Sequence, residues 1–484
     1  MTTLIFQGQG QTSKSKIDKK DLKTFVQILA SDSLEGRETG TEGQKRAEKF
    51  ISERFKSLGL HAYNQNGYLE KFKINQTYWG EVYIKTRSTI LKNFENMVFQ
   101  GSDTQNVETE IEVVFGGQGT EEEINQIEVK DRLVLIFVKN LRSSYEINTR
   151  LKKRKAAGII IANPENEKQF ESIKTTFKDF SLQKRLSLPN TDTKLNGFAK
   201  WDTIKFINTI TIPNSEVKNI IGHSIKDLRK LQEAKRIADV SFSKIKVKFE
   251  RLQNDIETAN VVGVIKGRNP KSIIISAHYD HLGKSGNEYF PGADDNASGT
   301  AALLEIAEEF SESKDLEYNL IFLATSGEEA GLLGSYYHVS HPDFDPKNVL
   351  CNLNLDMISR SDDKHSNSRY LYCIGTDQSA EIDNLIKRAD GLFDKCSFDY
   401  SLNNSKEPAG LFTRSDNYSF YNKGIVAIQF FSGLHLDYHK TSDTVEKIDF
   451  SNLENRVQLI SLVIELLEKE GLKNYRVGKG EFHP

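Results

Sequence analysis

The second half of this sequence alternates short apolar runs with helical patterns, and this alternation limits the fold more than any other feature. Runs with the length and composition of buried strands are "NVVGVIKG", "SIIISA", "NLIFLAT", "VLCNLNLDMI" and "IVAIQFF". Between two of these runs, one helix face is marked by Leu303, Ile306, Ala307 and Phe310. A last helix carries the apolar stripe Leu453, Val457, Ile460, Ile464 and Leu467. The pattern predicts an α/β domain built around a mostly parallel core sheet.

Histidines and acidic residues follow several of these predicted strands at the points where the strands end. The segment "AHYDHLGKSGNEYFPGADDNASG" (277–299) holds two histidines and three aspartates, among them His278, Asp280, Asp294 and Asp295. The other strand ends are followed by Glu328 and Glu329, by Asp356, and by His435, Asp437, Tyr438 and His439. Ligands of open α/β sheets bind beyond the carboxyl ends of the strands, so the sequence predicts one site at one rim of the sheet.

Each of these features alone has an ordinary structural explanation. A histidine after a strand is usually a surface residue or a hydrogen-bonded core residue, and paired acids before a helix are usually caps at the positive end of the helix dipole. Their repetition at separate strand ends favours a functional site instead. Imidazole with carboxylate and without cysteine suits zinc or another first-row ion better than calcium or magnesium.

The number of ligands is sufficient for two ions. Two divalent ions bring +4, three ligating carboxylates bring −3 and a bridging hydroxide brings −1, so such a site is neutral. One of the adjacent residues Glu328 and Glu329 is then left over as a base, and metal-bound water is the natural nucleophile. The residues alone do not decide between Asp294 and Asp295 as the bridging ligand.

The motifs "SAHYDHLG", "PGADDNASG", "TSGEEAGLLGS", "LNLDMIS" and "GLHLDYHKTSDT" stand in the order found in the co-catalytic di-zinc aminopeptidases, which the sequence resembles. That peptidase clan also contains glutamate carboxypeptidases, glutaminyl cyclases and the transferrin receptor ectodomain. The stretch 29–60 is similar to the N-terminal helix region of the family. The resemblance implies a mixed, mostly parallel sheet sandwiched by helices and a site with two Zn²⁺ ions.

The resemblance also implies a role for individual residues. His278 and Asp356 match ligands of one zinc, Glu329 and His439 match ligands of the other, and Asp295 matches the carboxylate that bridges them. Asp280 matches the partner that supports His278, and Glu328 matches the general base. Tyr438 is placed like the tyrosine that steadies the oxyanion in some relatives.

The activity implied is removal of N-terminal residues from peptides by metal-activated water. In aminopeptidase relatives, the free α-amino group of the substrate binds beside one metal, which restricts cleavage to the first residue. The stretch "RSDNYSFYNKG" (414–424) lies where the family shapes its specificity pocket, and it has Asn417 where a more typical member has histidine. The side-chain preference therefore stays open.

Residues 91–253 read as a β-rich insert, and "VVFGGQGT", "RLVLIFVKN", "KAAGIIIANP" and "ITIPNSEV" are similar to strands of a protease-associated domain. The peptidase domain is then discontinuous and comprises residues 18–90 and 254–484. Residues 1–17 are expected to be a disordered or processed N-terminus. Relatives with this arrangement are mostly exported, which favours a periplasmic or secreted protein, although no intact signal peptide is visible.

Composition excludes some partners. The chain of 484 residues carries 65 basic and 68 acidic residues, and a formal charge of −3 favours neither nucleic acid nor an anionic membrane. No apolar run reaches the ~18 residues that an integral membrane helix needs. Cys351, Cys373 and Cys396 are too few for a disulfide framework in a chain of this length. Peptide substrates are the expected partners, and the oligomeric state stays open.

Other members of the clan are expected to differ from an aminopeptidase in their ligands and domains. A receptor-like member is expected to have lost ligands, and a glutaminyl cyclase usually holds a single zinc and lacks the insert. A carboxypeptidase or dipeptidase of the same clan is the main alternative, and it needs arginines that bind a substrate carboxylate, for which Arg360 and Arg414 are candidates. A non-catalytic protein that binds peptides through the insert is the alternative from another functional class.

Overall fold

The computed structural model describes residues 15–65, 67–138, 143–166, 168–182, 185–189, 207–403 and 409–473. Most of the N-terminal segment that we expect to be disordered or processed, residues 1–14, lies outside these ranges. The chain divides into two compact units, of which unit 1 comprises residues 1–74, 187–197 and 256–484 and unit 2 comprises residues 75–186 and 198–255. The 91–253 boundaries of the insert and its protease-associated character stay predictions.

The centre of unit 1 is a mixed sheet with a parallel core, as the sequence pattern predicts. Its strand order is β17-β16-β18-β15-β11-β14-β10, and β11, β14, β15 and β18 are mutually parallel. The strands of this sheet are β10 (Ser243–Ile265), β11 (Asn269–His278), β14 (Tyr318–Thr325), β15 (Val349–Leu355), β16 (Tyr370–Ile374), β17 (Ser397–Asp399) and β18 (Val426–Phe431). The short strands β1 (His61–Ala62), β12 (Lys284–Ser285) and β13 (Glu288–Tyr289) lie outside this core.

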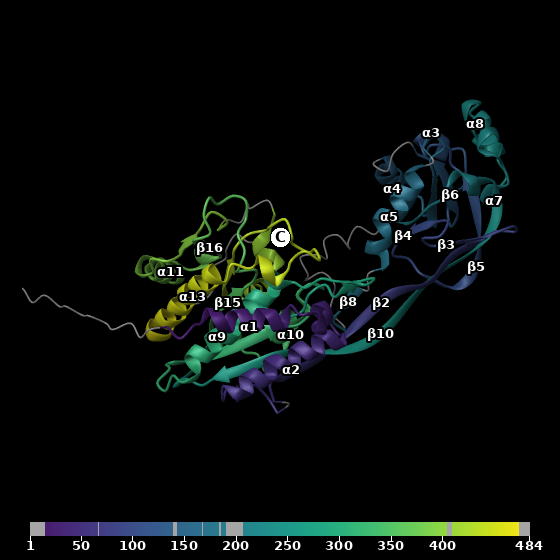
Figure 1. Ribbon diagram of the computed structural model, residues 1–484. Coiled ribbons are helices and arrows are strands. Elements are labelled where there is room, and N and C mark those ends of the chain that lie inside the picture. The colour runs from purple at the N-terminus through teal and green to yellow at the C-terminus, as the bar shows by residue number, and fades with distance from the viewer. Residues whose placement is uncertain are drawn as a thin grey trace, which may run out of the picture. The chain divides into compact units, whose positions relative to one another are not determined.

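Helices cover both faces of this sheet, because the strand residues that point to either face are apolar. The helices are α1 (Lys19–Leu29), α2 (Glu42–Ser57), α9 (Gly299–Ser311), α10 (Leu333–Ser340), α11 (Ala380–Leu392), α12 (Asn417–Tyr421) and α13 (Phe450–Glu470). Ile273 and Ile275 of β11 face the layer formed by α1, α2, α9, α11 and α13, whereas Ile274 faces α10 and α12. Helices α1, α9 and α13 contact one another within the first layer (Figure 1).

The local sequence explains where helix α2 begins and ends. The Thr41 side chain accepts a hydrogen bond from the backbone N–H of Gln44, which caps the N-terminus. Ala47, Ile51 and Phe55 form its buried face. Gly59 follows with a positive φ of 71°, the conformation that ends many helices. Helix α2 thus lies within the stretch 29–60 that resembles the N-terminal helix region of the family.

Unit 2 has its own sheet and core. Its strand order is β10-β5-β6-β7-β9-β4, in which β5, β6, β7 and β9 are parallel. The strands and helices are β2 (Leu69–Lys85), β3 (Ile90–Lys92), β4 (Val98–Gln100), β5 (Gln105–Phe115), β6 (Leu133–Phe137), β7 (Gly158–Ala162), β8 (Arg185–Ser187), β9 (Asn208–Thr211), α3 (Glu121–Ile124), α4 (Ser143–Lys153), α5 (Lys168–Leu182), α7 (Val217–Ile221) and α8 (Ile225–Glu233). Strands β2 and β10 each begin in one unit and end in the other.

Two further findings bear on the sequence predictions. Among the helices in the described part of the chain, none combines the length and apolarity needed to cross a bilayer. Cys351, Cys373 and Cys396 are buried free thiols, and burial raises the pKa of Cys351 to about 12.

Candidate metal centre

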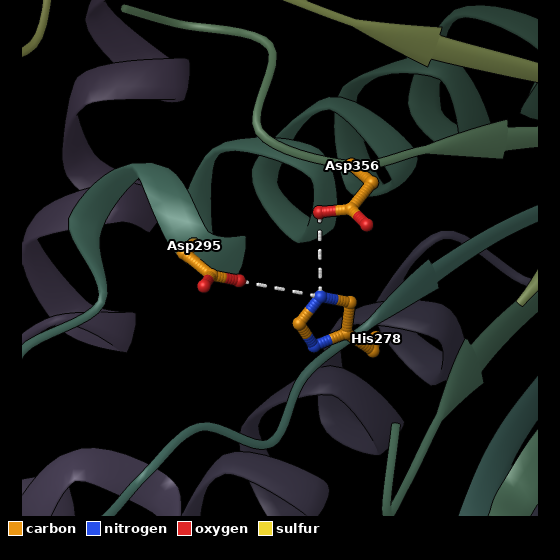
Figure 2. A group of neighbouring side chains, drawn as sticks. All are labelled: His278, Asp295 and Asp356. Carbon is orange, nitrogen blue, oxygen red and sulfur yellow. Dashed lines mark ion pairs between the residues drawn. The ribbon is translucent and has the colours of Figure 1, made fainter. Parts of the chain in front are cut away.

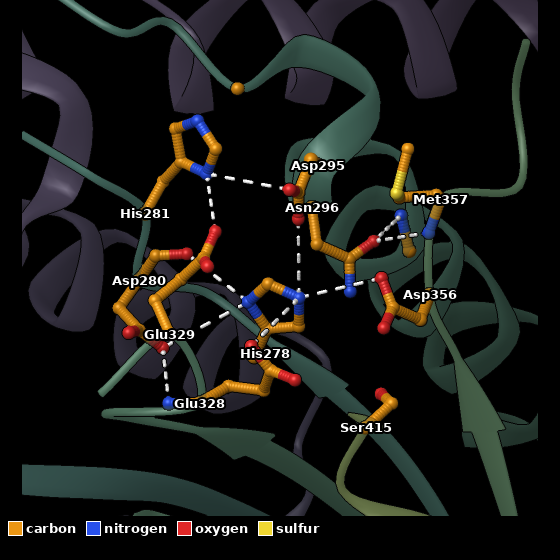
Figure 3. A network of polar contacts seen from close by, with 12 residues as sticks. His278, Asp280, His281, Asp295, Asn296, Glu328, Glu329, Asp356, Met357 and Ser415 are labelled. Atoms are coloured by element: carbon orange, nitrogen blue, oxygen red, sulfur yellow. Dashed lines mark hydrogen bonds and ion pairs between the residues drawn. The ribbon is translucent and has the colours of Figure 1, made fainter. Parts of the chain in front are cut away.

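The carboxyl ends of the parallel strands of unit 1 bring the predicted residues together. His278 is the last residue of β11, and Asp356 directly follows β15. Glu328 and Glu329 lie in the turn after β14, and His439 lies in the loop after β18. Because these four strands are parallel neighbours, their ends meet at one edge of the sheet. The structure therefore brings these predicted residues together, and Figure 3 shows His278, Glu328, Glu329 and Asp356 grouped there.

His278, Asp295 and Asp356 form a first group of possible metal ligands. The Nε2 atom of His278 lies 3.4 Å from Oδ1 of Asp295 and 3.4 Å from Oδ1 of Asp356. Figure 2 shows one nitrogen of the His278 ring facing both carboxylates. All three side chains are buried, so they are held close together with little solvent to screen their charges.

Asp295, Glu329 and His439 form a second group on the other side of Asp295. The Nε2 atom of His439 lies 3.1 Å from Oδ2 of Asp295 and 3.1 Å from Oε2 of Glu329. The two carboxylate oxygens of Asp295 therefore face different histidines. His439 is the most exposed of these side chains at 35%, so this group lies closer to solvent than His278 does.

The separations within both groups fit a zinc ion. Two ligand atoms that each bind zinc at 2.0–2.1 Å in tetrahedral geometry lie about 3.3 Å apart. The observed separations of 3.1 and 3.4 Å bracket that value. The donors are imidazole nitrogens and carboxylate oxygens, a set that suits zinc.

In the absence of a metal ion, hydrogen bonds between the histidines and the carboxylates shift the pKa values of both. Burial opposes the protonation of His439, but its hydrogen bonds with Asp295 and Glu329 raise its pKa to about 10. Burial also opposes the ionisation of Glu329, yet hydrogen bonds from His281 and His439 hold the pKa of this carboxyl well below its ordinary value. A divalent cation at this place would meet a Glu329 carboxylate that is already ionised.

Glu328 lies beside the first group without belonging to it. Its Oε2 atom is 4.0 Å from Nε2 of His278, and its side chain is buried. Burial raises the pKa of Glu328 well above its ordinary value; His278 opposes this shift, whereas the negative charges of Glu329, Asp356 and Asp416 increase it. A carboxylate whose pKa moves toward neutrality is suited to accept and return a proton.

Asp280 supports the segment around Glu328. Its Oδ1 accepts a hydrogen bond from the backbone N–H of Glu328 (3.2 Å), and its Oδ2 accepts one from the Thr39 hydroxyl (2.9 Å). Its Oδ1 is 3.9 Å from Nδ1 of His278, and that nitrogen lies closer, at 3.2 Å, to the backbone carbonyl of Asp280. Burial raises the pKa of Asp280 to about 6, with His278 opposing the shift.

Asp294 and Asp295 have clearly different surroundings. Asp294 accepts hydrogen bonds from the backbone N–H (2.8 Å) and the hydroxyl (2.5 Å) of Ser359, and its other oxygen lies 3.2 Å from Nε2 of His435. Asp294 therefore faces away from both ligand groups. Neither carboxylate caps helix α9, whose N-cap Ser298 makes no side-chain capping bond. The capping explanation is thus wrong for this pair.

Tyr438 borders the second group. Its ring stacks on that of His439 at 3.8 Å between centroids, and its hydroxyl accepts a hydrogen bond from Nη2 of Arg414 at 3.1 Å. Burial raises the pKa of Tyr438 far above its ordinary value, and Asp295 and Glu329 increase the shift. The phenol therefore stays protonated and can donate a hydrogen bond.

The two arginines considered as carboxylate binders differ in their partners. Arg360 donates a hydrogen bond to Oδ2 of Asp437 at 2.9 Å and lies 3.9 Å from Asp443, so it is part of an ion-pair network. Arg414 borders Tyr438. Asn417, which replaces the more typical histidine, is buried and donates a hydrogen bond to the backbone carbonyl of Phe412 at 2.8 Å.

Several residues that shape the site were not predicted as part of it. Asp443 accepts hydrogen bonds from the backbone N–H groups of both Asp294 and Asp295. Buried Arg37 donates hydrogen bonds to the carbonyls of Tyr279, Pro291 and Gly292 and to that of Leu29. His281 directly follows Asp280, and its nearness in sequence was the available signal for its place in the site.

Unit 2 contains a cavity of its own. Its volume is 390 Å³, and its lining includes Phe137 and Val138, at the end of strand β6, and Asn163 and Pro164, after strand β7. None of the groups of described residues able to hold a metal lines it.

The sequence is similar to known peptidases. The family model described as Peptidase family M28 matches residues 260–464. Aminopeptidase YwaD of Bacillus subtilis (strain 168) is 30% identical over 222 residues, covering 44% of this chain and 45% of that protein. Leucine aminopeptidase 1 of Uncinocarpus reesii (strain UAMH 1704) is 24% identical over 324 residues, covering 62% of this chain and 77% of that relative. The match with YwaD thus spans about half of that relative's length.

A solved structure shares the fold over nearly the whole chain. It is described as a zinc aminopeptidase from Bacillus subtilis and has a TM-score of 0.56, with 20% sequence identity. The superposition covers 96% of this chain and 99% of that one. The likeness shows that the α/β architecture is shared.

Proposed function

We propose that this chain is a zinc-dependent exopeptidase of peptidase family M28, whose model matches residues 260–464, and that it removes N-terminal residues from peptides. The observation that carries the proposal is the pair of ligand groups that share Asp295, with Glu328 beside them. The relatives named above support the choice of an aminopeptidase within the family.

The proposed ligands are His278, Asp295 and Asp356 for one Zn²⁺ ion. For the other ion, His281, Asp295 and Glu329 lie close enough to form a group, and we assign Asp295, Glu329 and His439 from the 3.1 Å contacts of His439 with both carboxylates. Two divalent ions held there supply Lewis acidity toward the scissile carbonyl and lower the pKa of water to about 7. Three ligating carboxylates and one hydroxide would leave such a site neutral. The separations within each group support this assignment.

The side chains around the ligands have complementary roles in this proposal. Glu328 takes a proton from the attacking water and returns it to the leaving amine, for which its raised pKa is suited. Asp280 fixes the backbone of Glu328 through the bond from its N–H. The Tyr438 hydroxyl, oriented by Arg414, donates a hydrogen bond to the developing oxyanion.

A carboxypeptidase of the same clan is the second candidate. Such an enzyme needs a cation that binds the terminal carboxylate of the substrate, and Arg414 borders the site beside Tyr438. Arg360 is a weaker candidate for this role because Asp437 already binds it. The two candidates differ in which end of a peptide they shorten.

The test is mass spectrometry of defined peptides incubated with the zinc-loaded protein. Each peptide is supplied with a free and with an acetylated N-terminus, and the Glu328→Gln variant is run in parallel. We expect single residues to be lost from the N-terminus of free peptides only, and the variant to leave the peptides intact. Shortening from the C-terminus would support the carboxypeptidase, and intact peptides throughout would contradict a peptidase.

We also propose a periplasmic or secreted location, on the resemblance to exported relatives that carry an insert. Fractionation of the source cells, followed by immunoblotting, tests this proposal. Recovery of the protein in the cytoplasmic fraction would contradict it.

A further inference from the structure

His281 lies behind the second ligand group and has no role in the proposed mechanism so far. Its side chain is fully buried, and its Nδ1 atom is 2.8 Å from Oε1 of Glu329. Figure 3 shows its ring facing Glu329 from the side opposite His278. Because Glu329 also faces His439 through its other oxygen, the carboxylate lies between two histidines.

The contact distances of His281 and His439 distinguish a hydrogen bond from a pair of ligands that bind the same metal ion. Ligands of one tetrahedral zinc lie about 3.3 Å apart, and the two contacts of His439 match that spacing at 3.1 Å. The 2.8 Å contact of His281 is a hydrogen-bond distance. Its Nδ1 is also 3.8 Å from Oδ2 of Asp295, which is too long for an edge of the same tetrahedron.

The surroundings of His281 hold its ring in this orientation. Its backbone N–H donates a hydrogen bond to the carbonyl of Arg37 at 3.2 Å. Gly292 packs so closely that a Cβ there would lie 2.5 Å from Cδ2 of the ring. The Nε2 atom is buried and has no hydrogen-bond partner among the described residues. Nδ1 is therefore the ring atom through which this histidine acts.

We propose that His281 is a positioning residue that holds Oε1 of Glu329, so that Glu329 offers the second zinc a single oxygen, Oε2. The inference rests on the proposed zinc site and assigns a further residue to it. Partners of this kind orient a ligand and prevent it from turning, and their loss typically weakens metal binding about 10- to 100-fold.

Two substitutions distinguish positioning from direct ligation. Leucine at position 281 keeps much of the volume but has no donor, whereas asparagine has an amide N–H that can reach the place of Nδ1–H. An amide is a poor zinc ligand, so asparagine restores binding only if His281 acts as a hydrogen-bond donor.

His338 provides a matched control within the same unit. It is buried, its Nδ1 lies 3.0 Å from Oε1 of the buried Glu70, and its Nε2 has no hydrogen-bond partner among the described residues. Its ring contacts are with Tyr63, Phe344 and Phe420 rather than with the metal centre. A His338→Leu substitution therefore removes the same kind of buried pair without touching the site.

The experiment measures zinc binding by the full-length protein after chelation and dialysis, in competition with a chromophoric zinc chelator. We expect His281→Leu to weaken one of two zinc ions about 10- to 100-fold and His281→Asn to remain within a few-fold of the parent protein. We expect His338→Leu to lower the melting temperature while leaving both zinc affinities unchanged.

The remaining outcomes overturn the inference. Parental affinity for both ions in His281→Leu would show that the contact does not position Glu329. A folded His281→Asn protein that has lost the second ion would indicate direct ligation, and this variant decides the question if His281→Leu does not fold. A parent protein that binds no zinc would overturn the proposed function as well, and this result is distinct from the others.

Discussion

At the scale of single residues, Asp295 joins the two ligand groups because its oxygens face His278 and His439. Sequence chemistry alone did not separate it from Asp294. The structure separates them through partners distant in sequence, since Ser359 and His435 occupy the carboxylate of Asp294. The backbone N–H groups of both residues are held by Asp443, which fixes the direction in which each side chain points.

Glu328→Gln tests the proposed base. Glutamine keeps the shape of the side chain but cannot accept the proton, so we expect kcat to fall by about 100- to 10,000-fold. Steady-state kinetics on a short peptide amide, with zinc content measured in parallel, checks this prediction. Zinc content should stay at the parental level because Glu328 belongs to neither ligand group. A variant with near-parental kcat would rule out this residue as the base.

Tyr438→Phe tests the proposed oxyanion donor. Loss of the hydroxyl that Arg414 orients should lower kcat about 100-fold and change KM little, since the bond forms mainly in the transition state. Tyr372→Phe is a matched control, because that hydroxyl donates to Oδ2 of Asp362 at 2.7 Å. Equal kinetics for the two variants would contradict the role of Tyr438.

Much of the proposed site could be predicted because its residues lie at the ends of apolar strands or in the loops that follow them. His278, Glu328, Glu329, Asp356 and His439 all do so. The residues that were missed act through contacts that no strand pattern reveals. Arg37 binds backbone carbonyls of segments far along the chain, and backbone groups leave no signature in the sequence. His281 was not predicted because its neighbours His278 and Asp280 already matched the roles that the motif implies.

At the scale of secondary-structure elements, the parallel strands of unit 1 were predicted because their apolar runs are continuous. Helices with clear stripes, such as α9 and α13, were predicted for the same reason. The expectations did not include α1, although Leu22, Phe25, Val26 and Leu29 have helical spacing. They also lacked the edge strand β17, which has only three residues and takes its structure from pairing with β16.

Helices α1 and α9 bring Glu305 close to Asp21 and Glu308, and this contact predicts a pH dependence. Oε2 of Glu305 accepts a hydrogen bond from the Asp18 N–H at 3.1 Å, whereas Oε1 has no hydrogen-bond partner among the described residues. Burial raises the pKa of Glu305 to about 8. The folded state therefore keeps this proton up to about pH 8, while the unfolded state loses it at about pH 4.5, the ordinary value for a glutamate.

Stability must then fall as pH rises between those two values, because the folded state binds more protons there. Glu305→Gln removes this slope. We therefore expect the free energy of unfolding of the variant, measured against that of the parent, to be about 1–3 kcal/mol more favourable at pH 8 than at pH 5. Urea unfolding at both pH values, with a chelator present, measures the difference. Glu312→Gln, at the exposed end of the same helix, should show no such change. A pH-independent difference for Glu305→Gln would contradict the prediction.

At the scale of the whole molecule, the proposed zinc site lies within one of the two compact units. All of its proposed ligands belong to residues 256–484, in unit 1. Unit 2 has its own hydrophobic cores, which include Ile160, Ile210 and Phe249 in one and Ile136 and Ile159 in another. A ligand that binds only one unit stabilises that unit by mass action.

Calorimetry with and without zinc should therefore show selective stabilisation. At a free zinc concentration of 100 times Kd, we expect unit 1 to gain about 2.7 kcal/mol and its transition to move to higher temperature. The transition of unit 2 should keep its position. An equal shift of all transitions, or no shift at all, would be inconsistent with a site confined to unit 1.

In the proposed site Asp295 would bridge two ions, and anomalous diffraction from zinc-loaded crystals at the zinc absorption edge tests this bridge. We predict two peaks about 3.5–4 Å apart, one on each side of Asp295. The first should be bounded by His278 and Asp356, and the second by Glu329 and His439. A single peak, or peaks that do not contact Asp295, would contradict the account.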